Sequence, residues 1–415
     1  MELDNSQKID VVMFNMSAYS EWQAGFVNRN SHVLHELLAS DKVRKIVAID
    51  YLPLTFKKAL KIWLQGVLHF KAGKKMSGGF FSRLTALSNS EINKTVYKVS
   101  NNDDVEYRLF NYSTVLSYFS EDKMLDDLNS SLAKLNLKNV VVWSYLPTFV
   151  GCFDKIQCRL KVFDAVDNWL EHSAYKSITD RLKLNYEIIK NKSDLIFTTS
   201  KEMVRYFDKR DGVFYIPNGV RWQMYKEPPK IVSRDIASLP RPIIGYVGIL
   251  QQDRIDLDLI RYLAENNPKK TFAFVGPVWP NFRKKLDSKL GDLKNVHFLG
   301  RKQYGEVPSY VSQFDVAIVP HLLNEFGKHT SLLKMMEYLA AGKPVVSTPT
   351  SGTDAFKKVV KLADTPEKFN KAIINSLTRD SMQSVKHRQE TAWQYSWTEQ
   401  VNIMLDKVIA SINYE

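Results

Sequence analysis

Short apolar runs alternate with longer amphipathic runs through the first half of the chain. The short runs are rich in Val, Ile and Phe and are bounded by polar residues, a pattern typical of β-strands. The longer runs repeat apolar positions three or four residues apart, which predicts α-helices. Strands are predicted at residues 8–14, 43–49, 105–110, 139–144, 160–164, 194–198 and 213–216, and helices at 29–40, 121–136 and 174–192.

The alternation stops at residues 218–240, where Asn218-Gly219 and Pro228-Pro229 are turn signals, and we predict an interdomain linker there. It then restarts, with strands predicted at 242–247, 271–275, 295–298, 315–319, 344–347 and 358–362, and helices at 256–265, 281–290, 304–313, 331–341, 366–378 and 398–412. Short apolar strands separated by helices favour parallel sheets covered on both faces. We therefore predict an α/β protein with two Rossmann-like domains.

The charge of the chain indicates an anionic partner, since the net charge is +13. Residues 53–84 contain seven basic residues and no acid. Basic and bulky apolar residues in one segment favour contact with an anionic membrane surface. The residues that we expect to make this contact are Lys57, Lys58, Lys61, Trp63, Phe80 and Phe81. A helical hairpin with a buried apolar face is the alternative. No nucleic-acid-binding signature is present, so no nucleic-acid partner is expected.

Three features predict a cytoplasmic protein, and the basic segment 53–84 would hold it on the inner face of the cell membrane. The first residues are polar and form no signal-peptide pattern. No apolar run is long enough to cross a bilayer. Cys152 and Cys158 have a spacing that matches no usual metal pair, so we interpret them as free thiols in a reducing compartment.

The stretch 327–349, GKHTSLLKMMEYLAAGKPVVSTP, carries the strongest candidate chemistry. The predicted helix places Lys334 and Glu337 on one face, because residues three apart are neighbours on a helix. Free N–H groups and the positive dipole end at a helix N-terminus suit a phosphate. The polar residues at that end are His329, Thr330 and Ser331. Lys334 can then reach a pyrophosphate, and Glu337 can accept hydrogen bonds from ribose hydroxyls. A plain surface helix before a strand is the alternative.

Residues 337–346, EYLAAGKPVV, match the pattern "E-[YA]-[LM]-A-x-G-x-P-V-V", which resembles the donor pocket of GT-B fold glycosyltransferases. Four more segments resemble, in order, bacterial family 4-like transferases of teichuronic-acid, capsule and exopolysaccharide synthesis. They are 163–169 (FDAVDNW), 194–200 (DLIFTTS), 216–220 (IPNGV) and 244–248 (IGYVG).

The resemblance implies two Rossmann-like domains that face a cleft. Residues 1–222 would bind the acceptor and residues 223–392 the nucleotide sugar. Residues 393–415 would form a C-terminal helix that crosses back to the first domain, with the aromatic residues at 393–397 between the domains.

The resemblance also assigns roles to residues. The residues expected to bind the donor are Gly248, Arg254, His329, Thr330, Ser331, Lys334 and Glu337. Asp167 is the favoured base or acceptor-orienting group, with Asp164 and His32 as further candidates. A helix-capping aspartate and a packed histidine are the structural alternatives. Many retaining enzymes of this fold carry two glutamates eight residues apart, but His329 stands where the first would be. Retaining and inverting courses therefore stay open.

The function that follows is a glycosyltransferase of the hexosyltransferase type that requires no metal and no cofactor. Its donor would be a UDP- or GDP-sugar, and its acceptor a lipid-linked or polysaccharide glycan of the bacterial cell surface. The alternatives are a nucleotide-sugar epimerase of the same fold and a non-catalytic glycan- or membrane-binding relative. An NAD-dependent dehydrogenase is disfavoured, because Gly245-Tyr246-Val247-Gly248 lacks the full dinucleotide fingerprint. Sugar, base, linkage and oligomeric state stay open.

Overall fold

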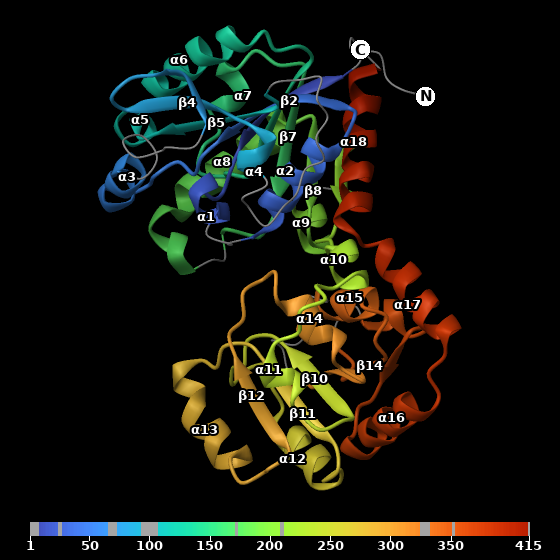
Figure 1. Cartoon of the computed structure of the whole chain (residues 1–415). Coiled ribbons are helices and arrows are strands. Elements are labelled where there is room, and N and C mark those ends of the chain that lie inside the picture. Colours follow the sequence, from blue (N-terminus) through green and yellow to red (C-terminus); the bar gives the residue numbers. More distant parts are fainter. Residues whose placement is uncertain are drawn as a thin grey trace. The chain divides into compact units, whose positions relative to one another are not determined.

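The chain divides into two compact units in the computed structural model (Figure 1). Unit 1 comprises Met1–Asn218 and Gln400–Glu415, and unit 2 comprises Gly219–Glu399. The structure describes residues 8–23, 27–64, 73–92, 107–170, 173–207, 211–323, 333–350 and 353–413. Each unit is built around one mostly parallel sheet. This is the α/β class that the sequence predicts.

Unit 1 contains a sheet of nine strands in the order β3-β4-β5-β2-β1-β6-β7-β8-β9. The strands are β1 (Ile9–Phe14), β2 (Val43–Ile49), β3 (Lys74–Gly78), β4 (Ser82–Leu87), β5 (Leu109–Thr114), β6 (Val140–Ser144), β7 (Leu160–Ala165), β8 (Leu195–Thr198) and β9 (Val213–Tyr215). The β3–β4 and β4–β5 pairs are antiparallel and the other pairs are parallel. The chain order reverses between β1 and β6, so the carboxyl ends of these strands form a ligand-binding position typical of this fold.

The helices of unit 1 connect these strands. They are α1 (Tyr19–Gln23), α2 (Arg29–Ala39), α3 (Phe56–Ile62), α4 (Asn89–Ile92), α5 (Leu116–Phe119), α6 (Glu121–Leu132), α7 (Cys152–Lys155), α8 (Thr179–Lys192) and α9 (Lys201–Tyr206). Capping starts several of them: Asn28 and Ser31 form a capping box at α2, and Ser120 and Ser200 cap α6 and α9.

Unit 2 contains a sheet of six parallel strands in the order β12-β11-β10-β13-β14-β15. The strands are β10 (Ile243–Val247), β11 (Thr271–Val275), β12 (Val296–Gly300), β13 (Val316–Val319), β14 (Val345–Ser347) and β15 (Val360–Leu362). Alternate residues of β11 belong to different apolar clusters: Ala273 and Val275 to one, Phe272 and Phe274 to the other. Both faces of this sheet are therefore buried. Its chain order reverses between β10 and β13.

The predicted helices of unit 2 are present as α12 (Leu257–Glu265), α13 (Pro280–Leu290), α14 (Val307–Ser312), α15 (Leu333–Ala340) and α16 (Pro366–Thr378). Three further helices of this unit were not predicted: α10 (Trp222–Lys226), α11 (Arg234–Ala237) and α17 (Met382–Trp393). The last helix, α18 (Trp397–Asn413), begins in unit 2 and continues in unit 1. Within the described ranges, no helix is both long and apolar enough to cross a membrane.

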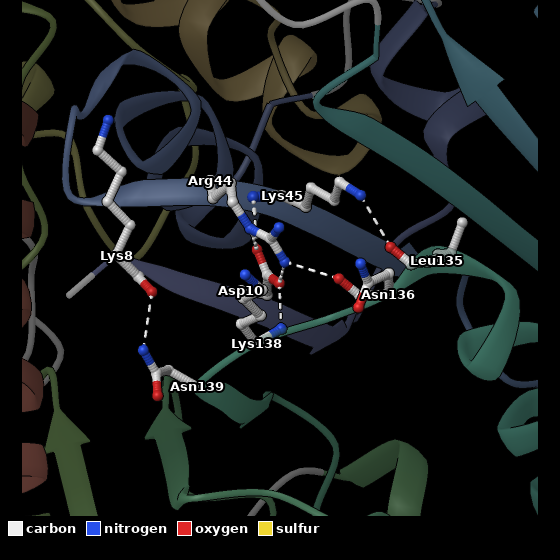
Figure 2. A network of polar contacts seen from close by, with 8 residues as sticks. All are labelled: Lys8, Asp10, Arg44, Lys45, Leu135, Asn136, Lys138 and Asn139. Atoms are coloured by element: carbon white, nitrogen blue, oxygen red, sulfur yellow. Dashed lines mark hydrogen bonds and ion pairs between the residues drawn. The ribbon is translucent and has the colours of Figure 1, made fainter. Parts of the chain in front are cut away.

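A buried carboxylate joins the amino ends of the central strands of unit 1 (Figure 2). Asp10 of β1 accepts hydrogen bonds from Arg44 Nε at 3.0 Å, from the Lys45 amide at 3.0 Å and from the Lys138 amide at 2.6 Å. Arg44 and Lys45 also donate to the Asn136 and Leu135 carbonyls. This network lies at the opposite end of the strands from the expected ligand position, so we assign it to the fold.

Two local predictions for unit 1 are wrong. The strand expected at 105–110 is β5 at Leu109–Thr114, where the polar residues Asn111, Ser113 and Thr114 are buried and weaken the apolar pattern. The helical hairpin considered for 53–84 is wrong too. That segment contains α3, the exposed edge strand β3 and β4, and residues 65–72 lie outside the described part.

Two expectations for unit 2 are corrected. The segment predicted as a linker is folded into unit 2, because Tyr225 and Ile236 are buried in one of its apolar clusters. The aromatic residues expected between the domains lie within unit 2: Trp393 contacts Trp222, and Tyr395 contacts Phe356.

The final helix, α18, begins in unit 2 and returns to unit 1, as predicted. Lys42 and Asp406 form an ion pair at 2.6 Å, and Lys407 Nζ lies 4.6 Å from the centroid of the Phe214 ring. Arg159 donates to the Ile412 carbonyl at 3.4 Å. These contacts hold the end of the chain against the strands of unit 1.

Candidate donor site and candidate membrane residues

The carboxyl ends of β10 and β13 form the candidate donor site of unit 2. Gly248, directly after β10, has a φ of +149°, which only glycine adopts easily. A Cβ at this position would lie 2.1 Å from Lys334 Cε and 2.8 Å from the Tyr246 hydroxyl oxygen. The missing side chain is therefore what lets Lys334 lie against the loop after β10.

Lys334 and Glu337 come from the first turns of α15 and lie on its inner side. Burial lowers the pKa of Lys334, the positive charge of Arg254 lowers it further, and Glu337 opposes both. Burial raises the pKa of Glu337, while a hydrogen bond with Tyr225 and the charge of Lys334 oppose the rise. Burial and Arg254 thus disfavour the charged form of Lys334, and an added negative charge beside Lys334 would stabilise that form.

Arg254 brings a second cation to this place. It is half-buried and its carbonyl accepts a hydrogen bond from the Leu322 amide at 2.8 Å, which joins the loops after β10 and β13. Its charge acts on Lys334, Tyr246 and His321. Two cations beside one carboxyl group make the site suitable for a di-anionic ligand.

The structure thus brings Gly248, Arg254, Lys334 and Glu337 together, although their role in donor binding stays a prediction. The other residues expected to bind the donor, His329, Thr330 and Ser331, lie outside the described residues.

Two residues of this cluster, His321 and Tyr246, were not among the predicted donor-binding residues. His321 is buried, and its Nε2 lies 3.4 Å from the Tyr246 hydroxyl oxygen. Burial lowers the pKa of His321 to about 3, with smaller contributions from Lys334 and Arg254. The histidine is therefore neutral at physiological pH. The available signal was its position just after the apolar run 315–319, at the end of a predicted strand.

The carboxylates of the D-x-D string at 256–258 have structural partners. Asp256 caps α12 by accepting from the Leu259 amide at 2.9 Å, and Asp258 pairs with Lys289 at 2.6 Å. In the described part of the chain, no group of three or more His, Cys, Asp or Glu residues could hold a metal ion.

The three predicted catalytic residues of unit 1 have different surroundings. Asp164 is fully buried and accepts from Arg29 Nε at 2.9 and 3.1 Å. Burial raises its pKa and Arg29 opposes the rise. Arg29 also donates to the Pro217 carbonyl at 3.2 Å. This geometry favours a positioning role for Asp164, because the Asp164 carboxylate holds Arg29 where Arg29 also contacts Pro217.

Asp167 differs from Asp164 in its exposure, and His32 differs from Asp164 in lying on a helix. Asp167 is exposed in the loop after β7, and its carbonyl accepts from the Tyr186 hydroxyl at 3.5 Å. His32 is buried in the first turn of α2, where its amide donates to the Asn28 carbonyl at 3.1 Å. Of the two, only Asp167 has the exposure that a base acting on a bound hydroxyl requires. Its catalytic role stays a prediction.

Comparison with known proteins supports the interpretation of unit 2. Residues 241–379 match the family described as glycosyl transferases group 1. TuaH of Bacillus subtilis, whose name places it in teichuronic acid biosynthesis, is 25% identical over 284 residues, which are 65% of this chain and 70% of TuaH. This match extends beyond the family segment into unit 1.

Solved structures show the same fold over nearly the whole chain. HepE of Anabaena in complex with UDP and glucose has a TM-score of 0.55 at 14% identity, covering 97% of this chain and 100% of HepE. A trehalose-phosphate synthase of Burkholderia xenovorans has a TM-score of 0.58 at 11% identity, covering 96% and 99%. A glycosyltransferase of Rickettsia africae has a TM-score of 0.59 at 12% identity, covering 98% and 100%.

Residues 241–379 thus resemble the group 1 glycosyl transferases, and the chain as a whole has the GT-B fold.

An exposed cluster of six aromatic rings lies on unit 1. We call it the aromatic surface, and it consists of Phe56, Trp63, Phe80, Phe81, Tyr118 and Phe119. Successive ring centroids lie 5.0 to 6.3 Å apart where the rings touch. Phe56 is 61% exposed, Phe80 64% and Phe119 62%. Such a group of exposed rings marks an interaction site.

The predicted membrane residues fall on or beside the aromatic surface. Trp63, Phe80 and Phe81 belong to it, and the Trp63 indole donates to the Phe80 carbonyl at 2.8 Å. Lys57, Lys58 and Lys61 are exposed on α3, which also carries Phe56. Tyr118 and Phe119 were missed, because α5 is distant in sequence and only the fold brings it beside β4. Membrane contact itself stays a prediction.

A buried acid near α3 was also missed. Asp50, just after β2, accepts from the Tyr19 amide at 2.9 Å and from Asn111 Nδ2 at 3.2 Å. Burial raises its pKa to about 6, and these hydrogen bonds oppose the rise. The cavity beside it has a volume of about 30 Å³. At about 10 to 15 Å³ for each, that volume holds roughly two or three water molecules, which is too little for a sugar.

Proposed function

We propose that this nucleotide-sugar-dependent glycosyltransferase moves a sugar from a UDP-sugar to a lipid-linked or polysaccharide acceptor of the bacterial cell surface. The observation that carries the proposal is the approach of Lys334 to Gly248 beside Arg254 and Glu337. UDP is favoured over GDP because HepE, which has the same fold, was solved in complex with UDP and with UDP-glucose.

The cluster of unit 2 supports binding and departure of a nucleoside diphosphate. In the reaction, an acceptor oxygen forms a bond to the anomeric carbon as the bond from that carbon to the diphosphate breaks. Negative charge then develops on the diphosphate, and preorganised cations in a poorly hydrated site stabilise it. Among the described residues, Lys334 and Arg254 are the cations that would stabilise this charge, and Glu337 would accept hydrogen bonds from the ribose hydroxyls.

The proton of the acceptor hydroxyl goes to a carboxylate, for which we propose Asp167. An exposed carboxylate after a central strand can approach a substrate hydroxyl without a change of backbone. Asp164 would act through Arg29 and not on the substrate itself.

The aromatic surface supports a peripheral position on an anionic membrane. Lys57 and Lys61 would contact acidic head groups, and the exposed rings would enter the interface between head groups and acyl chains. The similarity to TuaH supports a pathway of cell-wall glycan synthesis.

The test uses the full chain with UDP, GDP and dTDP in thermal-shift assays, followed by assays of diphosphate release from the matching nucleotide sugars. UDP should raise the melting temperature most, and a UDP-sugar should be turned over. If none of the three nucleotides shifts the transition, the non-catalytic relative is the better interpretation. Interconversion of a free UDP-sugar into its epimer would instead support the epimerase.

A further inference from the structure

A second and larger cavity of unit 1, with a volume of about 380 Å³, lies beside α3. We call it the α3–α8 pocket. Its walls come from the loops after β2 and β6, from α3 and from α8 with the 3₁₀ turn before it. The residues that line it are Tyr51, Leu54, Thr55, Lys58, Thr148, Tyr175, Ser177, Ile178, Arg181, Leu182 and Asn185. It lies at the carboxyl side of β2 and β6, where ligands of such sheets bind.

The polar groups of the α3–α8 pocket are suited to an anion. Its lining residues include the cations Lys58 and Arg181 but no carboxylate. Three hydroxyl groups, of Thr55, Thr148 and Ser177, add donors. Arg181 is held in place by Glu121 at 2.6 Å, so one of its sides is already paired. Within the described residues Lys58 forms no ion pair, and its Nζ lies 4.5 Å from the centroid of the Tyr51 ring.

The aromatic walls of the pocket suit a sugar ring. Tyr51 and Tyr175 both line it, and Tyr175 is fixed by stacking on Trp169 with centroids 4.6 Å apart. Burial raises the pKa of Tyr51 to about 12, so its hydroxyl stays protonated and can donate. A flat ring with a polar edge offers both an apolar face and a hydrogen bond. A cavity of this volume holds a hexose with a phosphate, as ligand pockets of a few hundred Å³ do.

Helix α3 contributes residues both to the α3–α8 pocket and to the aromatic surface. Thr55 and Lys58 line the pocket, while Phe56 and Lys57, their neighbours on the same helix, belong to or lie beside the aromatic surface. An acceptor could therefore keep its lipid in the membrane while its head group lies in the pocket.

We propose that the α3–α8 pocket binds the phosphate-bearing sugar head group of the acceptor, with Lys58 and Arg181 on the phosphate and Tyr51 and Tyr175 on the sugar. The acceptor is then a lipid-linked sugar phosphate or diphosphate and not a neutral polysaccharide. This inference rests on the proposed function, because it identifies the acceptor of that reaction.

The test measures binding of glucose 1-phosphate to the full chain by calorimetry, with UDP present in excess to occupy unit 2. Inorganic phosphate and glucose are titrated in parallel. Glucose 1-phosphate should bind more tightly than either. Lys58→Ala and Arg181→Ala should each weaken it about tenfold, because each removes a charge-assisted hydrogen bond. Lys57→Ala is the matched control on the same helix and should leave the affinity unchanged.

Two results would overturn the proposal. The first is an affinity for glucose 1-phosphate that neither pocket variant changes, or that Lys57→Ala changes as much. The second concerns the source of the phosphate. If Lys58→Ala with Arg181→Ala weakens binding to plain phosphatidylglycerol vesicles more than Lys57→Ala with Arg181→Ala, then Lys58 binds phospholipid head groups and not a sugar phosphate.

The UDP-induced shift in melting temperature separates this test from that of the proposed function. It depends on unit 2, so the pocket variants should retain it, and its retention also shows that they fold. Loss of sugar phosphate binding with an intact UDP shift supports the pocket. Absence of any UDP shift in the unmodified chain contradicts the proposed function instead.

Discussion

The donor cluster of unit 2 and the aromatic surface of unit 1 use the same residue types in opposite environments. A lysine lies near a tyrosine ring both in the donor cluster and in the α3–α8 pocket beside the aromatic surface: Lys334 Nζ is 5.9 Å from the centroid of Tyr246, and Lys58 Nζ is 4.5 Å from that of Tyr51. In the donor cluster Tyr246 is fully buried and Lys334 is half-buried, whereas in the pocket Tyr51 is half-buried and Lys58 is exposed. A cation in low dielectric interacts strongly with one nearby anion, while exposed cations act additively and are screened by salt.

This difference in burial separates two kinds of recognition. The cluster of unit 2 has fixed partners and desolvated charges, which suits one small ligand of defined geometry. The aromatic surface has many weak and adaptable contacts, which suits an extended anionic surface. Perturbing one charge should therefore be severe in unit 2 and mild in unit 1.

The largest expected effect is that of Lys334→Ala. Loss of the cation that meets the diphosphate should lower kcat about a hundredfold or more, in the range seen when one preorganised group is removed from an active site. It should also abolish the UDP-induced shift in melting temperature. Lys285→Ala, an exposed lysine of α13 in the same unit, is the control. Retention of the UDP shift by Lys334→Ala would remove the donor from this cluster.

The second prediction reverses the charges beside the aromatic surface. Lys57→Glu and Lys61→Glu on α3, together with Lys75→Glu on the exposed strand β3 of the same basic segment, leave Lys58 of the α3–α8 pocket intact. Each lysine contributes about 1 kcal/mol near an anionic surface, so vesicle affinity should fall by at least about 3 kcal/mol. Sedimentation with phosphatidylglycerol vesicles at low and high salt measures this.

The control variant changes the net charge by the same amount, but on unit 2: Lys284→Glu, Lys285→Glu and Lys371→Glu. These exposed residues lie on α13 and α16. Equal loss of binding in both triple variants would mean that total charge, and not the aromatic surface, determines attraction to the vesicles.

The third prediction compares two glycines. Gly248→Ala places a methyl group 2.1 Å from Lys334 Cε at a φ of +149°, whereas Gly300→Ala, at a φ of +70°, meets nothing within 4 Å. Both variants carry backbone strain of about 1 kcal/mol or more. The collision should cost Gly248→Ala about 1 to 3 kcal/mol beyond that and should weaken UDP binding. Urea unfolding and UDP titration measure the two effects. Similar UDP affinities in the two variants would argue against contact between the loop and the donor.

The smallest expected effect concerns pH. The pKa of His321 is about 3 in the folded protein against an ordinary 6.5, so below pH 6.5 the unfolded chain takes up a proton that the folded chain does not. The stability that follows from this is complete above pH 6.5 and is lost as the pH falls toward 3. Between pH 7.5 and pH 5 the loss should be about 2 kcal/mol.

His321→Gln should reduce this dependence, since glutamine does not titrate. The measurement is urea unfolding of both proteins at the two pH values, monitored by circular dichroism. An equal decrease of stability in the variant would assign the pH dependence to other groups.

The sequence alone predicted those features that depend on neighbours along the chain. The strand and helix alternation gave most elements of both sheets, because burial on both faces produces recognisable apolar runs. Lys334 and Glu337 were found because they are three residues apart on one helix. The return of the final helix and the family of unit 2 were also predicted.

Only the tertiary structure determined what depends on distant segments. It added His321 and Tyr246 to the donor cluster and Tyr118 and Phe119 to the aromatic surface. It also paired Asp164 with Arg29, a partner 135 residues away. The physical reason is that periodicity encodes which side of an element is buried, whereas contact between elements depends on how the strands are ordered in the sheet. No local pattern carries that order.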